Sequence, residues 1–355
     1  MSNANITVLV TGAAGYLGSW IVEYLLRDGF KVNGTIRSFQ DKSKYQHLLK
    51  LDEEYPGQLK LHEADLLQAG SFGDAMKGCE IVIHAASPYL FEKPENPEQE
   101  LIRPAIEGTR NVLEAVNKTT SVKRVVLTSS VVSLYSDACE VDEKRNFTVQ
   151  EKDNNNSKNA ELNPYAYSKT QAEALAWDIQ KQQQRWSLVT IHPGAIFGPS
   201  LSNRGDSTSV NMMIQFLNGS FRSGVPKLWL GLVDVRDVAE AHVRAAINNQ
   251  AKNRYIVVAE SLRLLEIAKL MAVEKLGLPN KLPKGEAPKF LMWLIAPFVG
   301  MQRSYVSRNV NYPLKFNNVR SKMELGVSYR SPVQTLNDHI QQIVNDGLLT
   351  RELGV

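Results

Sequence analysis

The stretch Ile6-Thr7-Val8-Leu9-Val10-Thr11-Gly12-Ala13-Ala14-Gly15-Tyr16-Leu17-Gly18 decides the fold of this chain. It combines a short apolar strand, a turn with the spacing Gly-x-x-Gly-x-x-Gly, and the start of a helix that we expect over Tyr16–Arg27. Glycines in such a turn let the backbone approach a pyrophosphate, while the helix N-terminus offers unpaired N–H groups to the anion. The spacing differs from the standard Gly-x-Gly-x-x-Gly. The dinucleotide interpretation therefore depends on the position of the turn between a strand and a helix.

The same alternation of apolar runs and helical stretches continues through the first half of the chain, as in a parallel sheet with helices on both faces. The predicted strands are 6–10, 31–36, 59–61, 81–85, 122–128 and 187–191. After about residue 193 the alternation loosens and a second lobe begins. We predict an α/β fold, a doubly wound parallel Rossmann sheet with a smaller C-terminal substrate lobe. The NADP(H)-binding Rossmann domain is assigned to 1–192, with 233–250 packing back on it, and the substrate-binding lobe to 193–232 and 251–345.

Three further segments carry local predictions. Residues 146–163 are polar, and their few apolar residues follow neither the spacing of a helix nor that of a strand. This pattern predicts a surface loop. A helix is expected after Ser261, which can cap it, and before Gly277, which can end it. Residues 290–301 are apolar, but Pro297 interrupts them and they fall short of the roughly 20 residues of a membrane span. We expect a buried or interfacial helix there.

Composition and charge exclude several classes of protein. The 41 Lys+Arg and 37 Asp+Glu residues are scattered and give a net charge of only +4, so nucleic acid is not an implied partner. Cys79 and Cys139 cannot form a disulfide framework, and no Cys/His spacing resembles a metal site. The N-terminal residues do not resemble an export signal. We expect a cytoplasmic protein with no metal and no integral membrane segment.

The end of the second strand bears on the choice of cofactor. In NAD-binding folds an acidic residue at this point bonds the ribose 2′-hydroxyl. Here Arg37 takes that place, and Lys42 and Lys44 follow it. A guanidinium can pair with a 2′-phosphate, which predicts NADP(H) rather than NAD(H). The alternative is a solvated surface arginine.

Other residues at the ends of predicted strands complete the cofactor set. Asp65 has the side chain to bond the adenine amino group, or to form a turn. The small residues after His84 let the backbone approach a ligand, whereas His84 itself has no neighbour in sequence that would orient it for catalysis, and we assign it no role. The predicted cofactor contacts are Gly12, Ala14, Gly15, Tyr16, Leu17, Gly18, Arg37, Lys44, Asp65, Leu66, Ala85, Ala86, Ser87, Thr128, Ser129, Tyr165, Lys169, Pro193, Gly194 and Ile196.

The candidate catalytic residues are Tyr165, Lys169 and Ser130. Residues four apart share one face of a helix, so the ammonium of Lys169 can lie near the phenol of Tyr165 and lower its pKa, whereas Tyr167 is out of register. A Tyr and a Lys four residues apart are common by chance, so the pair alone is weak evidence for a catalytic site. The glycine turn upstream supports the catalytic interpretation. Ser129 and Ser130 end the fifth strand and point in opposite directions. We choose Ser130 to hold the substrate oxygen and expect Ser129 to be structural.

Taken together, the glycine turn, Thr128-Ser129-Ser130 and Tyr165-x-x-x-Lys169 resemble the extended short-chain dehydrogenases/reductases. The segments 84–88, 168–173, 193–199 and 234–239 resemble the dihydroflavonol 4-reductase and cinnamoyl-CoA reductase group. The resemblance implies that Ser130 is the catalytic serine, that Tyr165 is the acid, and that Lys169 bonds the nicotinamide ribose. It places Pro193 and Gly194 at the nicotinamide.

Two departures limit what the resemblance implies about the substrate. Residues 131–135 differ from the wall with which plant flavonoid enzymes hold a phenol, and the signature Asn-Trp-Tyr-Cys-Tyr of cinnamoyl-CoA reductases is absent. Neither a flavonoid nor a CoA thioester is therefore inferred. Residues 216–232 and 290–301 are rich in large apolar side chains, Trp293 and Phe298 among them. They predict either the core of the second lobe or a pocket for a bulky apolar carbonyl compound.

We expect NADPH-dependent reduction of a ketone or aldehyde to an alcohol, or the reverse oxidation, by a monomer or a homodimer. Two other functions share parts of this pattern. A nucleotide-sugar epimerase or dehydratase keeps NAD bound, and Arg37 argues against it. A redox sensor binds the dinucleotide without chemistry and does not need Ser130, Tyr165 and Lys169 together.

Overall fold

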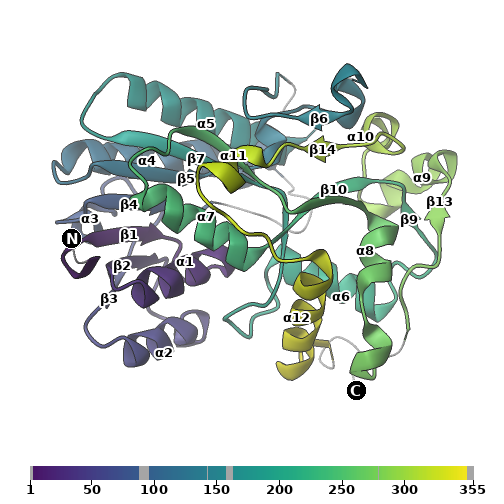
Figure 1. The fold of residues 1–355 in the computed structure, drawn as a ribbon, viewed down its shortest axis with the longest axis horizontal. Coiled ribbons are helices and arrows are strands. Elements are labelled where there is room, and N and C mark those ends of the chain that lie inside the picture. The colour runs from purple at the N-terminus through teal and green to yellow at the C-terminus, as the bar shows by residue number, and fades with distance from the viewer. Residues whose placement is uncertain (1–2, 88–95, 142, 157–162, 279, 350–355) are drawn as a thin grey trace.

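The computed structural model describes residues 3–87, 96–141, 143–156, 163–278 and 280–349. A seven-stranded parallel sheet dominates the N-terminal part of the molecule (Figure 1). Its strands run in the order β11 (Asn253–Val257), β7 (Ser187–Pro193), β5 (Arg124–Thr128), β4 (Ile81–His84), β1 (Thr7–Thr11), β2 (Lys31–Ile36) and β3 (Leu59–Glu63). The order reverses at β1, so the carboxyl ends of β1 and β4 face the crevice where dinucleotides bind in such sheets.

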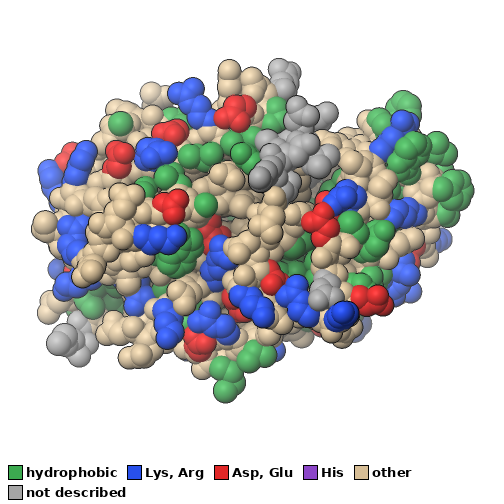
Figure 2. All heavy atoms as spheres, turned by 90° about the horizontal axis from the view of Figure 1, so that it is seen from above, with side chains coloured by type: hydrophobic (Ala, Val, Ile, Leu, Met, Phe, Trp, Pro, Cys, Tyr) green, Lys and Arg blue, Asp and Glu red, His purple; other side chains and the backbone are tan. Residues whose placement is uncertain are grey.

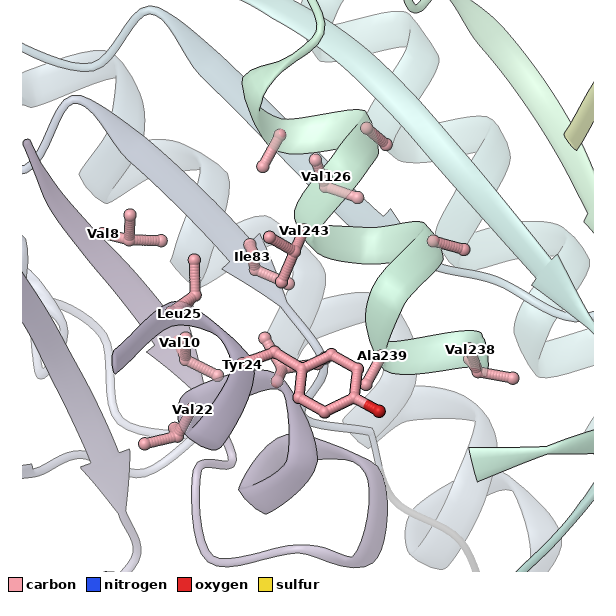
Figure 3. Close-up of a cluster of buried hydrophobic side chains, with 14 of the residues drawn as sticks. Val8, Val10, Val22, Tyr24, Leu25, Ile83, Val126, Val238, Ala239 and Val243 are labelled. Carbon is pink, nitrogen blue, oxygen red and sulfur yellow. The ribbon is translucent and has the colours of Figure 1, made fainter. Parts of the chain in front are cut away.

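Helices cover both faces of this sheet. One layer contains α1 (Tyr16–Arg27), α2 (Gln46–Glu54) and α7 (Val235–Ile247), and the other contains α3 (Gly73–Met76), α4 (Arg103–Lys118) and α5 (Pro164–Lys181). Figure 3 shows Val8 and Val10 of β1 packed with residues of α1 and α7. Leu9 points the opposite way, into the core beneath α4 and α5. Strands buried on both faces explain the nearly continuous apolar runs.

The smaller lobe is built around a second core. A three-stranded sheet orders β12 (Glu260–Arg263), β10 (Trp229–Asp234) and β8 (Ala195–Phe197), against which α6 (Thr208–Asn218), α8 (Leu264–Leu270) and α12 (Pro332–Asn345) pack. The remaining described strands and α-helices are short. Strand β6 (Thr148–Val149) pairs with β14 (Lys315–Phe316), and β9 (Val225–Pro226) pairs with β13 (Glu286–Ala287). The short helices are α9 (Lys289–Ile295), α10 (Arg303–Asn309) and α11 (Val319–Met323). The predicted α/β fold with a doubly wound Rossmann sheet and a smaller C-terminal lobe is confirmed.

Each predicted strand of the first half lies in the large sheet, and the first helix has the predicted bounds. One boundary is wrong. β11 falls within 251–345, which the sequence assigned to the substrate lobe, yet it pairs with β7 at the sheet edge. Its pairing partner is about 60 residues away, which local pattern does not reveal. The rest of the division into 1–192, 193–232, 233–250 and 251–345 stays a prediction.

Two local predictions also need correction. Ser261 does not cap a helix because it lies in β12, and the helix instead begins after Arg263, whose backbone N–H donates to Glu266 at 2.8 Å. The helix ends at Leu270, and a separate 3-10 turn reaches Gly277. The described part of the 146–163 loop includes the two-residue strand β6, while 157–162 lie outside the described residues.

Most of the apolar segment 290–301 is exposed, although Met292 and Ala296 are buried. It forms α9 and a 3-10 turn at Ala296–Val299, and the side chains of Phe290 and Phe298 are 70% and 88% exposed. Among the described residues, no helix combines the length and the apolar character that crossing a bilayer requires.

Candidate active site

The glycine turn lies where β1 ends and α1 begins. Gly12 has φ +67°, and a Cβ there would lie 3.0 Å from Cα of Ala86 at the end of β4. A Cβ on Gly18 would lie 2.1 Å from the carbonyl oxygen of Gly12, so only glycine lets α1 pack this closely on the turn. The backbone N–H of Gly12 donates to the hydroxyl of Thr35 at 3.3 Å. These contacts hold the first turn of α1 at the carboxyl edge of the sheet.

Three other predicted cofactor contacts lie in or next to the glycine turn. Ala14 and Leu17 are half-buried at the start of α1. Tyr16 instead reaches the smaller lobe, because its hydroxyl donates to the carbonyl of Gly198 at 2.6 Å. The hydroxyl of Tyr16 therefore joins the two lobes at the turn, and its contact with a cofactor stays a prediction.

At the adenosine end, Arg37 follows β2 and is exposed, and within the described ranges its guanidinium has no carboxylate partner. The ammonium of Lys44 lies 3.6 Å from the carboxylate of Asp41, an exposed pair that costs little to separate. Asp65 uses one carboxylate oxygen to accept from the N–H of Leu67 at 2.7 Å, which is the turn geometry. The carbonyl of Leu66 accepts from the amide of Asn111 at 2.7 Å.

Replacing Arg37 with alanine is expected to weaken NADPH binding about ten- to a hundredfold while NADH binding changes little, because a charge-assisted contact to a phosphate is lost. Fluorescence titration with both cofactors measures the difference. Lys31→Ala, at the opposite end of β2, is the matched control and should affect neither cofactor. Equal weakening of NADPH and NADH by Arg37→Ala would refute the assignment.

The end of β4 is fixed by a hydrogen-bonded threonine. The hydroxyl of Thr11 lies 2.8 Å from Nδ1 of His84 and accepts from the N–H of Ala86 at 3.1 Å. Burial and the Lys169 cation lower the pKa of His84 to about 3, so the imidazole is neutral at physiological pH. This arrangement orders the small-residue segment Ala85, Ala86 and Ser87. Pro88 lies outside the described residues.

The two serines after β5 point to different surroundings. Ser129 is buried, and its hydroxyl donates to Oε2 of Glu173 at 2.6 Å. Ser130 is extended, with φ −160°, and its hydroxyl accepts from the N–H of Val132 at 3.4 Å, so its own proton remains to be donated. The alternation expected from strand geometry holds here.

Lys169 lies one helical turn after Tyr165 on α5, which Asn163 caps by accepting from the N–H of Ala166 at 3.1 Å. The ammonium of Lys169 is buried and donates to the carbonyl of Thr128 at 3.2 Å. Burial lowers the pKa of Lys169 to about 8, although the carboxylate of Glu173 acts in the opposite direction. Tyr165 is half-buried. The lysine is thus a cation near its titration point, on the face of α5 that Tyr165 shares by helix period.

Several predicted residues meet in one small cavity of about 10 Å³ at the carboxyl edge of the sheet. Its lining includes Ala86, Ser87, Thr128, Ser129 and Lys169. Pro193 ends β7 beside this edge, and a Cβ on Gly194 would lie 2.1 Å from the carbonyl oxygen of Gly231. Ile196 is half-buried in β8. The structure therefore brings together the β4, β5 and α5 residues, while the adenosine residues lie further along the same edge.

Glu173 is a buried member of the site that the sequence reasoning missed. Its carboxylate also accepts from Ser133 at 2.9 Å, from the indole of Trp177 at 3.1 Å and from the guanidinium of Arg254 at 2.6 Å. Burial alone would raise the pKa of Glu173, but its electrostatic interactions with His192 and Arg254 and its hydrogen bonds with His192 and Ser129 hold the pKa well below its ordinary value. The signals in the sequence were its position one turn after Lys169 and its place in the segment 168–173, which resembles the reductase group.

Comparison with known proteins agrees with this geometry. Tetraketide alpha-pyrone reductase 1 of Arabidopsis thaliana is 34% identical over 99% of this chain and 100% of its own length. Cinnamoyl-CoA reductase 1 of the same plant is 33% identical over 98% of this chain and 92% of its own. The structure of Gre2 from Candida albicans in complex with NADPH is 30% identical and superposes with a TM-score of 0.79 over 96% of this chain and 99% of that chain.

The model of one protein family matches the part of the chain that contains the glycine turn and the carboxyl ends of the strands of the large sheet. It matches residues 8–259, from the first strand past Arg254, and so includes Ser130, Tyr165 and Lys169. The relatives place the chain with the extended short-chain reductases that resemble dihydroflavonol 4-reductase. This chain belongs to the NAD dependent epimerase/dehydratase family.

Proposed function

We propose that this protein is an NADP(H)-dependent oxidoreductase that reduces a bulky apolar ketone or aldehyde to an alcohol, or runs the reverse oxidation. The observation that carries the proposal is the buried ammonium of Lys169, held by the Thr128 carbonyl one helical turn from Tyr165. No carboxylate among the described residues pairs directly with this ammonium. Burying a cation in this way costs stability, which is typical of functional sites. The NADPH complexes of Gre2 from two yeasts support the cofactor.

The residues at the carboxyl edge fit this cofactor. Cβ atoms at Gly12 and Gly18 would meet neighbouring backbone at 3.0 and 2.1 Å, and the bare backbone of such a turn is what a pyrophosphate approaches. Arg37 is exposed and free of a carboxylate partner among the described residues, as an arginine that receives a 2′-phosphate must be. When bound there, the nicotinamide would supply or accept a hydride at the carbonyl carbon.

The chain's own residues then manage the proton and the substrate oxygen. Ser130 donates a hydrogen bond to the carbonyl oxygen and orients it. Tyr165 transfers its phenolic proton to that oxygen as the C–H bond forms, which completes the alcohol and leaves a phenolate. The Lys169 ammonium stabilises this phenolate, and by resemblance also bonds the nicotinamide ribose. The reverse oxidation uses the same groups with the phenolate as base.

The apolar wall near Ser130 supports an apolar substrate. Val132 and Tyr135 lie shortly after Ser130 in the chain. They are partly buried against a hydrophobic cluster that includes Val131, and Trp229, Tyr312 and Phe316 pack against the same cluster. These side chains replace the 290–301 segment as the proposed pocket wall, because Phe298 is exposed rather than enclosed.

Trp229→Ala is expected to raise KM for bulky ketones about tenfold, with much less effect on small aldehydes, because a large apolar contact is removed. Initial rates of NADPH oxidation on both substrate classes measure this. Trp293→Ala, at the surface of α9, is the control and should change neither KM. A similar loss on both substrate sizes would exclude Trp229 from the pocket.

The decisive experiment follows NADPH absorbance across aldehydes, ketones, dihydroflavonols and sterols with the purified protein. Turnover of a carbonyl substrate with NADPH supports the proposal. Copurifying NAD with activity only on UDP- or GDP-sugars would favour the epimerase or dehydratase alternative. Dinucleotide binding without turnover of any substrate would favour the sensor.

A further inference from the structure

The helix α9 and the following 3-10 turn expose an unusual amount of apolar surface. We call this surface the apolar tip. Its side chains are Phe290, Leu291, Trp293, Leu294, Phe298 and Val299, all of them exposed. Figure 1 places α9 at the end of the molecule opposite the β1–β3 side of the large sheet. Contiguous apolar patches of this kind on soluble proteins mark interaction sites.

The packing of the smaller lobe does not account for the apolar tip. Within the described residues 290–301, only Met292 and Ala296 are buried, against Val306 of α10 and Val310 just after it. These two positions, four residues apart, anchor one face of α9 to α10. Ile295 is partly buried against the same cluster, whereas the six side chains of the apolar tip are exposed and belong to none of the described hydrophobic clusters.

The charged residues of the segment that carries the apolar tip are almost all basic. Residues 281–308 contain the cations Lys281, Lys284, Lys289, Arg303 and Arg308, with Glu286 as the single acid. Glu286 is already paired with Arg263 at 3.1 Å, and Arg308 is neutralised by Asp137 and Glu140. The cations without a carboxylate partner among the described residues are Lys281, Lys284, Lys289 and Arg303.

Two of these cations border the apolar side chains directly. The guanidinium of Arg303 lies 4.4 Å from the ring centre of Trp293, and the ammonium of Lys289 lies 4.6 Å from that of Tyr312. The ammonium of Lys289 also donates to the carbonyl of Ser307 at 2.7 Å, and Lys289 immediately precedes Phe290 in α9. Cationic side chains beside aromatic ones are typical of the boundary between lipid and water. Figure 2 shows green and blue side chains together at this end of the molecule.

We propose that the apolar tip inserts into the surface of an anionic lipid membrane. A second copy of the chain is a poorer occupant, because a symmetric contact would set the same unpaired cations against each other. A fluid anionic surface accepts a convex patch without shape complementarity, and it pairs the cations with lipid phosphates. The tip lies away from the cofactor edge, so insertion leaves that edge accessible.

The test is cosedimentation of the purified protein with vesicles of phosphatidylcholine alone or mixed with phosphatidylserine. The wild type should bind the mixed vesicles and lose binding as salt is added. Phe290→Ser with Phe298→Ser should lower the partition coefficient about tenfold or more. Lys289→Glu with Arg303→Glu should weaken binding to the mixed vesicles only. The matched control is Val319→Ser with Met323→Ser, which removes exposed apolar side chains from α11.

No binding of the wild type to the mixed vesicles would overturn the proposal, as would equal binding by the wild type and both tip variants. A dimer that the phenylalanine variant abolishes, without vesicle binding, would overturn it in favour of self-association. If the double variant unfolds, Phe298→Ser alone provides the test, since that side chain is 88% exposed. Circular dichroism and light scattering distinguish these cases, and none of them requires enzymatic activity.

Discussion

Replacing Tyr165 with phenylalanine is expected to lower kcat about a hundred- to ten-thousand-fold, the usual contribution of a general acid. The aromatic ring at the start of α5 remains, but no proton can reach the substrate oxygen. NADPH binding should stay nearly intact because the glycine turn and Arg37 are unchanged. Steady-state rates of NADPH oxidation give kcat, and fluorescence titration gives the cofactor Kd.

The control for this variant lies on the same helix. Tyr167→Phe removes a phenolic proton two residues further on, where the side chain points away from the Lys169 face. It should keep kcat near the wild-type value. Near wild-type turnover by Tyr165→Phe on any accepted substrate would show that another group supplies the proton.

The sequence predicted the large sheet well because strand–turn–helix signals are local. The bounds of α1 follow from the glycine turn at one end and Asp28-Gly29 at the other, and both signals lie within a few residues of the helix. β11 was missed because it is an edge strand that joins β7 after the chain has passed through the second lobe. Ser261 was misread as a cap because hydroxyl residues serve equally well in strands such as β12.

Some residues of the candidate site could also be predicted from local spacing, whereas others depend on contacts between distant parts of the chain. Tyr165 and Lys169 could be paired from helix period alone, and the opposite directions of Ser129 and Ser130 from strand period. Glu173 shares that helix period with Lys169. Its importance, however, comes from Arg254, which lies 81 residues away and contacts it at 2.6 Å. Periodicity also could not tell whether the apolar run around Trp293 faced a core, a pocket or solvent.

Glu173 connects the site to the interior and should be the most sensitive residue after Tyr165. Its carboxylate holds Ser129 and Ser133, the two serines that flank the turn presenting Ser130. The hydroxyl of Ser133 also lies 2.8 Å from the carbonyl oxygen of Ser130, so its one proton is shared between that oxygen and Glu173. Loss of the negative charge leaves the guanidinium of Arg254 without its buried partner. Breaking a buried pair of this kind costs about 3–5 kcal/mol of folding free energy.

The same carboxylate acts on the charge of Lys169. The ionisable groups around this lysine are Tyr165 and Glu173 on α5, His84 on β4 and His242 on α7, and burial keeps both histidines neutral at physiological pH. Glu173 is thus the anion that favours the ammonium form. With the pKa of Lys169 at about 8, activity should fall as the pH rises above that value. Without Glu173 the pKa is lower, and the fall begins at lower pH.

Glu173→Gln is therefore expected to destabilise the protein by about 3–5 kcal/mol at neutral pH and to move the alkaline limb of kcat/KM to lower pH. Because the folded pKa of Glu173 lies below its ordinary value, its stabilising effect is present at neutral pH and shrinks as the pH falls below the carboxylate range. Urea denaturation at neutral and acidic pH measures the first effect, and pH–rate profiles measure the second. Glu240→Gln, which removes the partly exposed partner of Arg244, is the control and should cost at most about 1 kcal/mol. A destabilised Glu173→Gln protein with an unmoved alkaline limb would mean that Glu173 only supports the serine turn and does not set the charge of Lys169.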